Sequence, residues 1–145
     1  MILNNQVYGC ILVSPYKRFL LVQGHSSGKW SFPKGHPNKD ELPLDCAKRE
    51  LLEETGLRAP FMYYNSYQLA TGFYYMYKTP EEYDCKTMDP DEIKNVSWFT
   101  ISEIQKISVN IDVNTFLRQQ RRYPFPLKGT KPTFLTNSSS TGKRV

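Results

Sequence analysis

The sequence lacks the features that place a protein in a membrane or outside the cell. None of its apolar runs approaches the roughly 18 residues of a membrane-spanning helix. Its first residues also lack the basic and apolar regions of a secretion signal. Its three cysteines, Cys10, Cys46 and Cys85, are an odd number without metal-like spacing, so we expect free thiols. We therefore expect a cytoplasmic protein with no membrane association.

Acidic residues are absent from the C-terminal end. None follows Asp112, whereas seven basic residues do, so residues 1–112 carry a net charge of −2 although the whole chain carries +5. A slightly acidic body with a basic end suits an enzyme with carboxylates at its centre and affinity for polyanions at its margin. A basic tail that only aids solubility explains the charge equally well.

Strand-like and helix-like segments alternate, which predicts the α/β class. Strands are expected over residues 7–13, 19–23, 30–32 and 96–99, and two more within 63–77, bent at Thr71-Gly72. Three helices are expected. The first begins near Pro43 and stops at Gly56, the second covers 101–107 with Thr100 or Ser102 as its cap, and the third covers 112–122.

The chain has the length of a single domain with its own core. We expect this domain to cover residues 1–124 and to end in a basic helix. Residues 125–145 are rich in proline, serine and basic residues, which predicts a flexible tail. Residues 24–29 and 78–90 are expected to be polar loops.

Acidic residues are concentrated in the stretch GHPNKDELPLDCAKRELLEETGL, which covers residues 35–57. On a helix, Glu50, Glu53 and Glu54 share one face, where like charges repel. Lys48 and Arg49 precede this cluster, so we expect no cation on its face. Divalent cations would relieve the repulsion, because Mg²⁺ takes oxygen ligands. From spacing alone, an ordinary acidic helix face is an equally good interpretation.

The wider spacing of this segment resembles the Nudix box at every defining position. The matching residues are Gly35, Glu41, Arg49, Glu50, Leu51, Glu53, Glu54, Gly56 and Leu57. The resemblance extends over about residues 7–122. It implies the Nudix fold, an α/β/α sandwich around a mixed β-sheet. It also implies an enzyme that hydrolyses a nucleoside diphosphate linked to another group.

The same resemblance implies roles for individual residues. Glu50, Glu53 and Glu54 would bind Mg²⁺ (or Mn²⁺), with one of them acting as general base. The backbone of Gly35 would approach the metal closely, where a side chain would obstruct it. Glu41 and Arg49 would pair and hold the loop against the helix.

Lys34 lies directly before the box, where it could reach a substrate phosphate as a point charge. An exposed loop lysine is the alternative interpretation.

Several segments look like the catalytic domain of the eukaryotic mRNA-decapping enzymes, including positions that the Nudix box leaves free. They are residues 8–12, 20–24, 30–35, 39–41 and 45–47. Residues 91–99 resemble the segment in which those enzymes carry a further glutamate facing the metals. Glu92 is the candidate here, and a surface glutamate is the alternative. Residues 33–36 are also similar to animal-type diadenosine tetraphosphate hydrolases.

The last expected helix puts Arg118, Arg121 and Arg122 on one side. This resembles the basic C-terminal helix that decapping enzymes use as an RNA path, and such contacts are independent of sequence and sensitive to salt. An amphipathic helix with exposed arginines is the alternative.

Decapping enzymes also carry a helical regulatory domain ahead of this one, which helps to bind the cap and recruits an activator. The present sequence begins at the first expected strand, so we expect cap-binding aromatics to come from elsewhere, with Tyr74, Tyr75 and Tyr77 as candidates. A core position is the more common role of aromatics at strand spacing. We therefore expect activity on capped RNA either to be weak or to depend on a protein activator that the sequence does not identify.

Three functions fit the sequence. The first is hydrolysis of the 5′ cap of mRNA, with release of a capped nucleoside diphosphate. The second is hydrolysis of dinucleoside polyphosphates or other nucleoside diphosphate derivatives. The third is a non-catalytic module that binds RNA or nucleotides. The intact glutamate set disfavours the third, because a silent module has no need to tolerate that repulsion.

Overall fold

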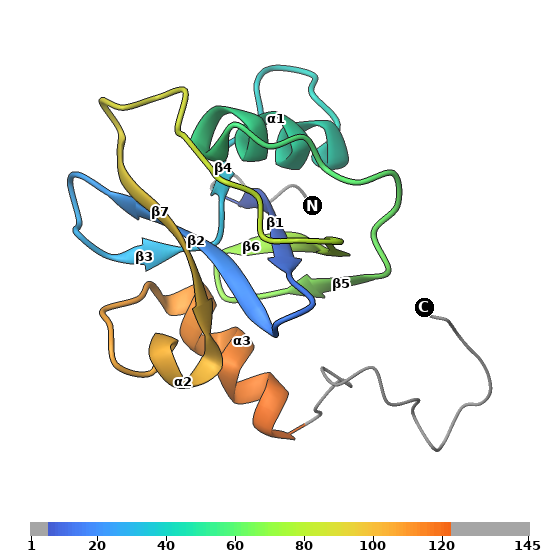
Figure 1. Cartoon of the computed structure of the whole chain (residues 1–145). Helices are drawn as coiled ribbons and strands as arrows, with labels where there is room; N and C mark the ends of the chain where they lie inside the picture. The colour runs from blue at the N-terminus through green and yellow to red at the C-terminus, as the bar shows by residue number, and fades with distance from the viewer. Residues whose placement is uncertain (1–5, 123–145) are drawn as a thin grey trace.

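The strand β1 (Val7–Val13) has apolar side chains on both faces, and this determines how the domain is layered. In the computed structural model, which describes residues 6–122, Ile11 and Val13 belong to the core beneath α2 and α3. Cys10 and Leu12 belong to a second core beneath α1. A strand that is apolar on both faces requires a cover on each side. The helices supply it, so the expected α/β/α sandwich is confirmed (Figure 1).

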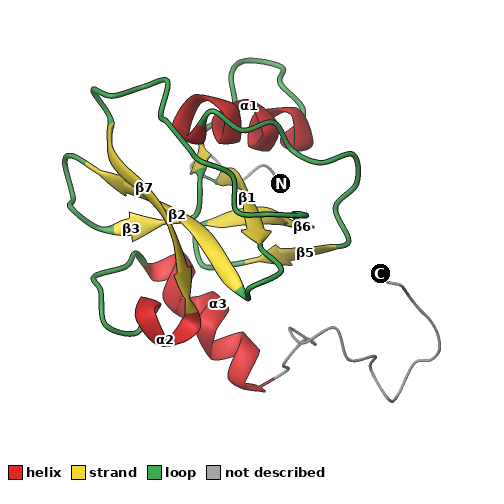
Figure 2. Cartoon of the chain, in the orientation of Figure 1, coloured by secondary structure: helices red, strands yellow, loops and turns green. Residues whose placement is uncertain are grey.

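The sheet is mixed and is centred on β1 and β2 (Figure 2). The strand β1 pairs in parallel with β6 (Gly72–Lys78) and antiparallel with β2 (Arg18–Gly24) and β4 (Lys34–Gly35). The strand β2 also pairs antiparallel with β3 (Trp30–Ser31) and β7 (Ile93–Thr100), and β5 (Asn65–Gln68) pairs with β6.

The helix α1 (Pro43–Thr55) has the bounds that the sequence predicts. Proline stands in its first turn, where the missing N–H costs no hydrogen bond. Gly56 ends the helix in the left-handed conformation at φ 78°, and its N–H donates to the carbonyl of Leu52. Ala47 and Leu51 are buried against the sheet, which turns the glutamates of the same helix toward β4.

The two remaining helices differ slightly from the prediction. The helix α2 (Ile101–Ile104) is shorter than expected, and Thr100 is its cap, in a reciprocal capping box with Glu103. The helix α3 (Ile111–Arg122) begins one residue early because Asn110 caps it. The Asn110 Oδ1 accepts a hydrogen bond from the backbone N–H of Val113 at 3.0 Å.

The strand β4 is absent from the prediction, because Pro33 and Gly35 suggest that the preceding strand ends there. Its two residues pair with Tyr8 and Gly9 of β1, a partner that is distant in the sequence. Gly9 permits this pairing, since a Cβ at that position would collide with the carbonyl oxygen of Pro33. The strand β7 also begins earlier than expected.

The flexible tail predicted for residues 125–145 lies outside the described residues. Within residues 6–122, no helix has the length and apolarity required to cross a membrane.

Candidate active site

The helix α1 and the strand β4 bring the predicted carboxylates together with the loop that precedes them. Glu54 is 3% exposed, and its Oε1 accepts a hydrogen bond from the backbone N–H of Lys34 at 3.1 Å. Glu50 lies against Gly35, where a Cβ would overlap the Glu50 carboxylate. A glycine is therefore required for β4 to approach the acidic face of α1 this closely.

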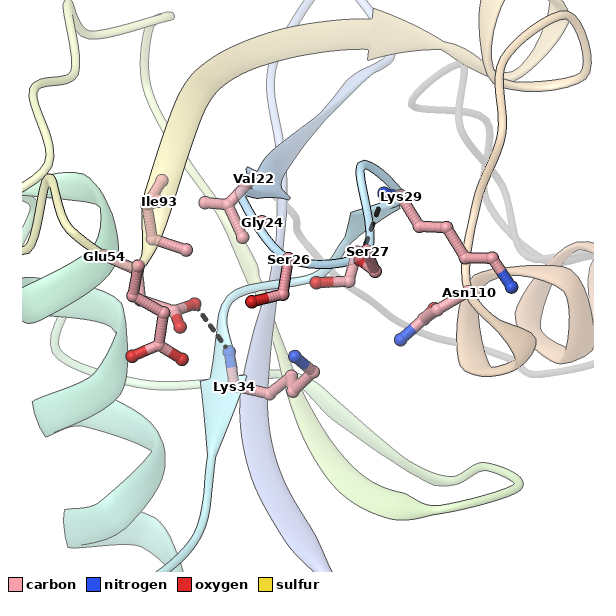
Figure 3. A pocket seen from close by; sticks show the side chains of 11 residues that line it. Val22, Gly24, Ser26, Ser27, Lys29, Lys34, Glu54, Ile93 and Asn110 are labelled. Carbon is pink, nitrogen blue, oxygen red and sulfur yellow. Dashed lines mark hydrogen bonds between the residues drawn. The ribbon is translucent and has the colours of Figure 1, made fainter.

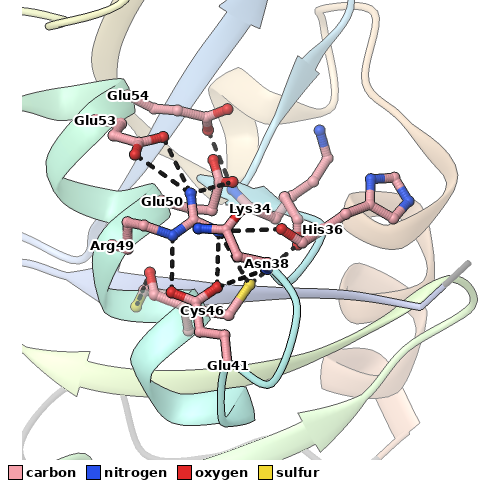
Figure 4. A network of polar contacts seen from close by, with 12 residues as sticks. Lys34, His36, Asn38, Glu41, Cys46, Arg49, Glu50, Glu53 and Glu54 are labelled. Atoms are coloured by element: carbon pink, nitrogen blue, oxygen red, sulfur yellow. Dashed lines mark hydrogen bonds and ion pairs between the residues drawn. The ribbon is translucent and has the colours of Figure 1, made fainter.

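Arg49 joins the loop over residues 36–41 to the helix (Figure 4). Its Nε donates to Oε2 of Glu41 at 2.8 Å and its Nη2 to Oε1 of the same carboxylate at 2.9 Å. The Nη2 also donates to the backbone carbonyl of His36 at 3.1 Å. This two-pronged geometry is the strong form of an arginine–carboxylate pair. The structure thus places Glu41 and Arg49 in contact, as the Nudix resemblance implies.

The same guanidinium also reaches the acidic cluster. The Nη1 of Arg49 donates to Glu50 at 3.1 Å and to both carboxylate oxygens of Glu53 at 3.2 Å. The expectation that no cation lies on the face of the cluster is therefore wrong. Glu53 is four residues after Arg49, and a long side chain spans that spacing along the helix. Part of the repulsion among the glutamates is thus relieved from within the protein.

The carboxylates of the site differ in the ease with which they ionise. The hydrogen bonds from Arg49 lower the pKa of Glu41 from 4.5 to about 2. Burial raises the pKa of Glu54 to about 8, although the nearby charge of Lys34 opposes the shift. Burial also raises the pKa of Glu50. The negative charge of Glu92 contributes to the raised pKa values of both Glu50 and Glu54, so these three carboxylates are electrostatically coupled.

The donor set fits a hard divalent cation in chemistry, although Arg49 shares its carboxylates. Among residues 6–122, no three His, Cys, Asp or Glu side chains form a group that could hold an ion as they stand. Glu53 is turned toward Arg49, whereas Glu54 is turned toward Lys34 (Figure 4). Carboxylate oxygens and the carbonyl of Gly35 are ligands that Mg²⁺ accepts.

A pocket of about 190 Å³ opens beside the carboxylates (Figure 3). Glu54, Glu92 and Lys34 line it, so the structure brings these three predicted residues together. The sequence prediction missed its other polar residues, which come from the loop after β2, from β3 and from the cap of α3. They are Ser26, Ser27, Lys29, Ser31 and Asn110. The loop was recognisable as polar, but its position beside the glutamates depends on the fold.

The tyrosines considered for cap binding have a different position. Tyr74 and Tyr77 are fully buried, and Tyr75 is 8% exposed. The hydroxyl of Tyr74 donates to the buried carboxylate of Asp112 at 2.6 Å. The expectation that these tyrosines stack on a cap is therefore wrong, because they fill the two cores of the domain.

The three predicted RNA-binding arginines lie at the C-terminal half of α3. Arg118, Arg121 and Arg122 are all exposed, while Phe116 and Leu117 of the same helix are buried. The guanidinium of Arg118 donates to the hydroxyl of Thr115 at 3.3 Å. The arginines are thus available to solvent on the face of α3 that does not pack on the sheet.

Comparison with known proteins assigns the chain to a family. The family model described as NUDIX domain matches residues 4–120, and the chain therefore belongs to the Nudix family. Several relatives carry the names of hydrolases, among them the "m7GpppN-mRNA hydrolase" of Saccharomyces cerevisiae, which is 28% identical over 117 residues.

The curated relatives include decapping enzymes. The "mRNA-decapping enzyme subunit 2" of Arabidopsis thaliana is 32% identical over 105 residues, which cover 68% of this chain and 28% of that protein. The "m7GpppN-mRNA hydrolase dcap-2" of Caenorhabditis elegans is 34% identical over 109 residues, which cover 67% of this chain and 14% of that protein. The chain thus spans less than a third of the length of these relatives.

Solved structures share the fold at lower identity. The Ap4A hydrolase of C. elegans, in a binary complex, superposes with a TM-score of 0.64 at 20% identity. The match covers 81% of this chain and 97% of that one. The likeness confirms the Nudix fold.

Replacing Arg49 with alanine tests its role as the link between loop and helix. The change leaves Glu41, whose side chain is 16% exposed, without its guanidinium. Breaking a buried ion pair costs about 3–5 kcal/mol, and the partial exposure here favours the lower value, so we expect Tm to fall by roughly 10 °C. Thermal unfolding of Arg49→Ala, with the exposed Arg58→Ala as control, measures this. An inactive Arg49→Ala with unchanged Tm would instead indicate a direct chemical role.

The buried Glu54 carboxyl predicts how the stability of the metal-free protein depends on pH. Its pKa rises from 4.5 to about 8 on folding, so between these values the folded protein binds more protons than the unfolded chain. The free energy of unfolding should therefore decrease as pH rises through this window. A bound cation favours the ionised carboxylate, so the increase in Tm on adding Mg²⁺ should be larger at about pH 8.5 than at about pH 6. Thermal unfolding in EDTA and in Mg²⁺ measures this, and a Mg²⁺ effect independent of pH would contradict it.

Proposed function

We propose that this Nudix hydrolase is a metal-dependent enzyme that cleaves the triphosphate bridge at the 5′ end of capped RNA, with release of a capped nucleoside diphosphate. The observation that carries the proposal is the convergence of Glu54 and Glu92 with Lys34 around one pocket, next to Glu50 and Glu53. The decapping relatives support the choice of substrate, since they align with most of this chain.

The carboxylates of α1 and the carbonyl oxygen of Gly35 would hold Mg²⁺ or Mn²⁺. Such an ion, when bound, neutralises phosphate oxygens and lowers the pKa of a water molecule. Glu53 would act chiefly in holding the cation, because it already lies with Glu50 beside Arg49. Glu54 and Glu92 line the pocket itself, so one of them would receive the proton of the attacking water.

The remaining residues would hold and orient the substrate. Lys34 extends along the pocket opposite Glu54, where its ammonium group would neutralise a phosphate (Figure 3). Glu41 and Arg49 would keep the loop and the helix in register, so that Gly35 and the glutamates remain on either side of the site. The exposed arginines of α3 would contact the phosphates of the RNA body.

A second candidate substrate is a dinucleoside polyphosphate. Residues 33–36 are similar to those of the diadenosine tetraphosphate hydrolases, and the pocket would accept phosphates from either substrate. The exposed arginines favour capped RNA, because α3 leads away from the pocket and a small dinucleotide does not extend along it (Figure 1).

Replacing Glu53 or Glu54 with glutamine tests the catalytic assignment. Glutamine keeps the shape of the side chain but removes the charge that binds a cation or accepts a proton. We expect Mg²⁺-dependent turnover to fall by at least about 100-fold in each variant, while Tm is retained. Steady-state kinetics on a cap dinucleotide measures the fall, with the exposed Glu81→Gln as control. Near-normal turnover of either variant would refute the assignment.

Replacing Arg118, Arg121 and Arg122 together with alanine tests the RNA path. If the three guanidinium groups neutralise phosphates of a single strand, the slope of log affinity against log salt should decrease in magnitude by about 2. The KM for long capped RNA should increase relative to the KM for a free cap dinucleotide.

A control variant removes the same charge elsewhere, by changing the exposed Arg58, Lys86 and Lys106 to alanine. If both triple variants lose affinity for RNA equally, the effect comes from net charge and not from α3. If long and short substrates are weakened alike, α3 supports the fold. If neither is weakened, dinucleoside polyphosphates become the better candidate.

A further inference from the structure

The pocket beside the carboxylates has two chemically different walls. Glu54 and Glu92 make one wall acidic. The opposite side carries Lys29, Lys34 and Asn110, together with three serines, and none of the described residues that line the pocket is aromatic (Figure 3). Such a site suits an anion. The lysines and hydrogen-bond donors would bind one side of the anion, and a metal cation held by the carboxylates would bind the other.

The size of the pocket limits its occupant. Its volume of about 190 Å³ is below the roughly 300–1,000 Å³ of pockets that enclose a whole drug-sized ligand. Within residues 6–122, its lining offers no aromatic platform on which a base could stack. A phosphate group with its adjoining bridge oxygen fits both the volume and the chemistry better than a nucleobase does.

The lysine-bearing wall is held in place by hydrogen bonds within the loop after β2 and from Gln23. In the loop after β2, the N–H of Gly28 donates to the carbonyl of Gly24 at 3.0 Å, and the N–H of Lys29 donates to Ser27 Oγ at 3.1 Å. The side-chain amide of Gln23 donates to the carbonyl of Gly28 at 2.9 Å. Gly28 has φ 72°, a conformation that few other residues adopt without strain. The loop is therefore shaped before any ligand arrives.

The side chain of Asn110 has an oxygen that caps α3 and an amide nitrogen that can donate a hydrogen bond to a ligand. Its Oδ1 caps α3 by accepting from the N–H of Val113, so its Nδ2 is the group left to face the pocket (Figure 3). The backbone N–H of Asn110 donates to the carbonyl of Trp30 at 3.0 Å, which fixes the cap beside β3. The first turn of α3 adds the partial positive charge of a helix N-terminus.

We propose that Lys29, Ser27 and Asn110 form a second phosphate subsite, next to the phosphate that lies at the carboxylates and Lys34. This subsite makes the enzyme select bridges of three or more phosphates over diphosphates. The inference rests on the proposed function, because it assumes that hydrolysis takes place at the glutamates. The further point is that contacts from the loop after β2 and from the cap of α3 make binding depend on the number of phosphates in the bridge.

Two substitutions separate the subsite from the fold. Asn110→Asp keeps a side-chain oxygen that can cap α3, but it replaces the donating amide with a negative charge that repels phosphate. Lys29→Gln removes a charge from an exposed side chain. The matched control is Lys106→Gln, which removes the same charge from an exposed position that does not line the pocket. Asn110→Ser keeps a cap and removes the amide without adding charge.

The first measurement compares kcat/KM for a triphosphate-bridged cap dinucleotide with kcat/KM for ADP-ribose, a diphosphate. The wild-type ratio should favour the triphosphate. In Lys29→Gln and Asn110→Asp the ratio should fall by about tenfold, as expected for one lost hydrogen bond to a charged group, mainly through KM. Lys106→Gln should keep the wild-type ratio. An unchanged ratio in both pocket variants, with Tm retained, would overturn the subsite.

The second measurement needs no hydrolysis. In EDTA, inorganic tripolyphosphate should raise Tm of the wild-type protein more than orthophosphate does, and Lys29→Gln and Asn110→Asp should lose most of this difference. If the wild-type protein hydrolyses neither substrate, the proposed function fails, but the tripolyphosphate effect still tests the pocket. If tripolyphosphate stabilises all variants equally, the subsite is refuted whatever the enzyme hydrolyses.

Discussion

The guanidinium of Arg49 is the contact on which the candidate site depends. With one planar group it holds Glu41 and the carbonyl of His36 in the loop, and Glu50 and Glu53 on the helix. An ammonium group could not replace it, because a point charge does not offer donors in a fixed fork. The loop and the helix are therefore positioned by the same group that compensates the acidic cluster. A cation that binds there must compete with Arg49 for two carboxylates.

Glu54 is the residue of the site whose burial is most unfavourable for the stability of the fold. A carboxylate that is 3% exposed loses its hydration, and its raised pKa reflects this loss. One backbone hydrogen bond from Lys34 offsets only part of the cost. Natural proteins tolerate such local violations chiefly at functional sites. The close approach of β4, which Gly9 and Gly35 permit, is what buries this carboxylate between helix and sheet.

The helix α3 connects the pocket with the exposed arginines. Its cap, Asn110, lines the pocket, and its last turns expose the arginines. With 12 residues, the helix spans about 18 Å. Asp112 anchors it to the sheet, because its buried carboxylate accepts hydrogen bonds from Thr71 and from Tyr74. One helix thus has a residue that lines the pocket at its N-terminal end and exposed arginines at its C-terminal end.

The sequence by itself determined the α/β class, the bounds of α1 and the set of glutamates. These follow from local patterns, such as the alternation of strand-like and helix-like segments and the helical spacing closed by Gly56, whereas the layered sandwich was implied by the Nudix resemblance. The tertiary structure decided the rest. Four features depend on contacts that spacing in the sequence does not reveal. They are the strand β4, the burial of Glu54, the hydrogen bonds from Arg49 to the acidic cluster and the place of Asn110 in the pocket. Aromatic spacing in β6 was compatible with either stacking on a ligand or filling the core, and only the packing of two helical layers buried Tyr74 and Tyr77. Local periodicity specifies which face of a strand or helix is apolar, whereas the contacts of a polar side chain depend on which distant backbone the fold brings within hydrogen-bonding distance.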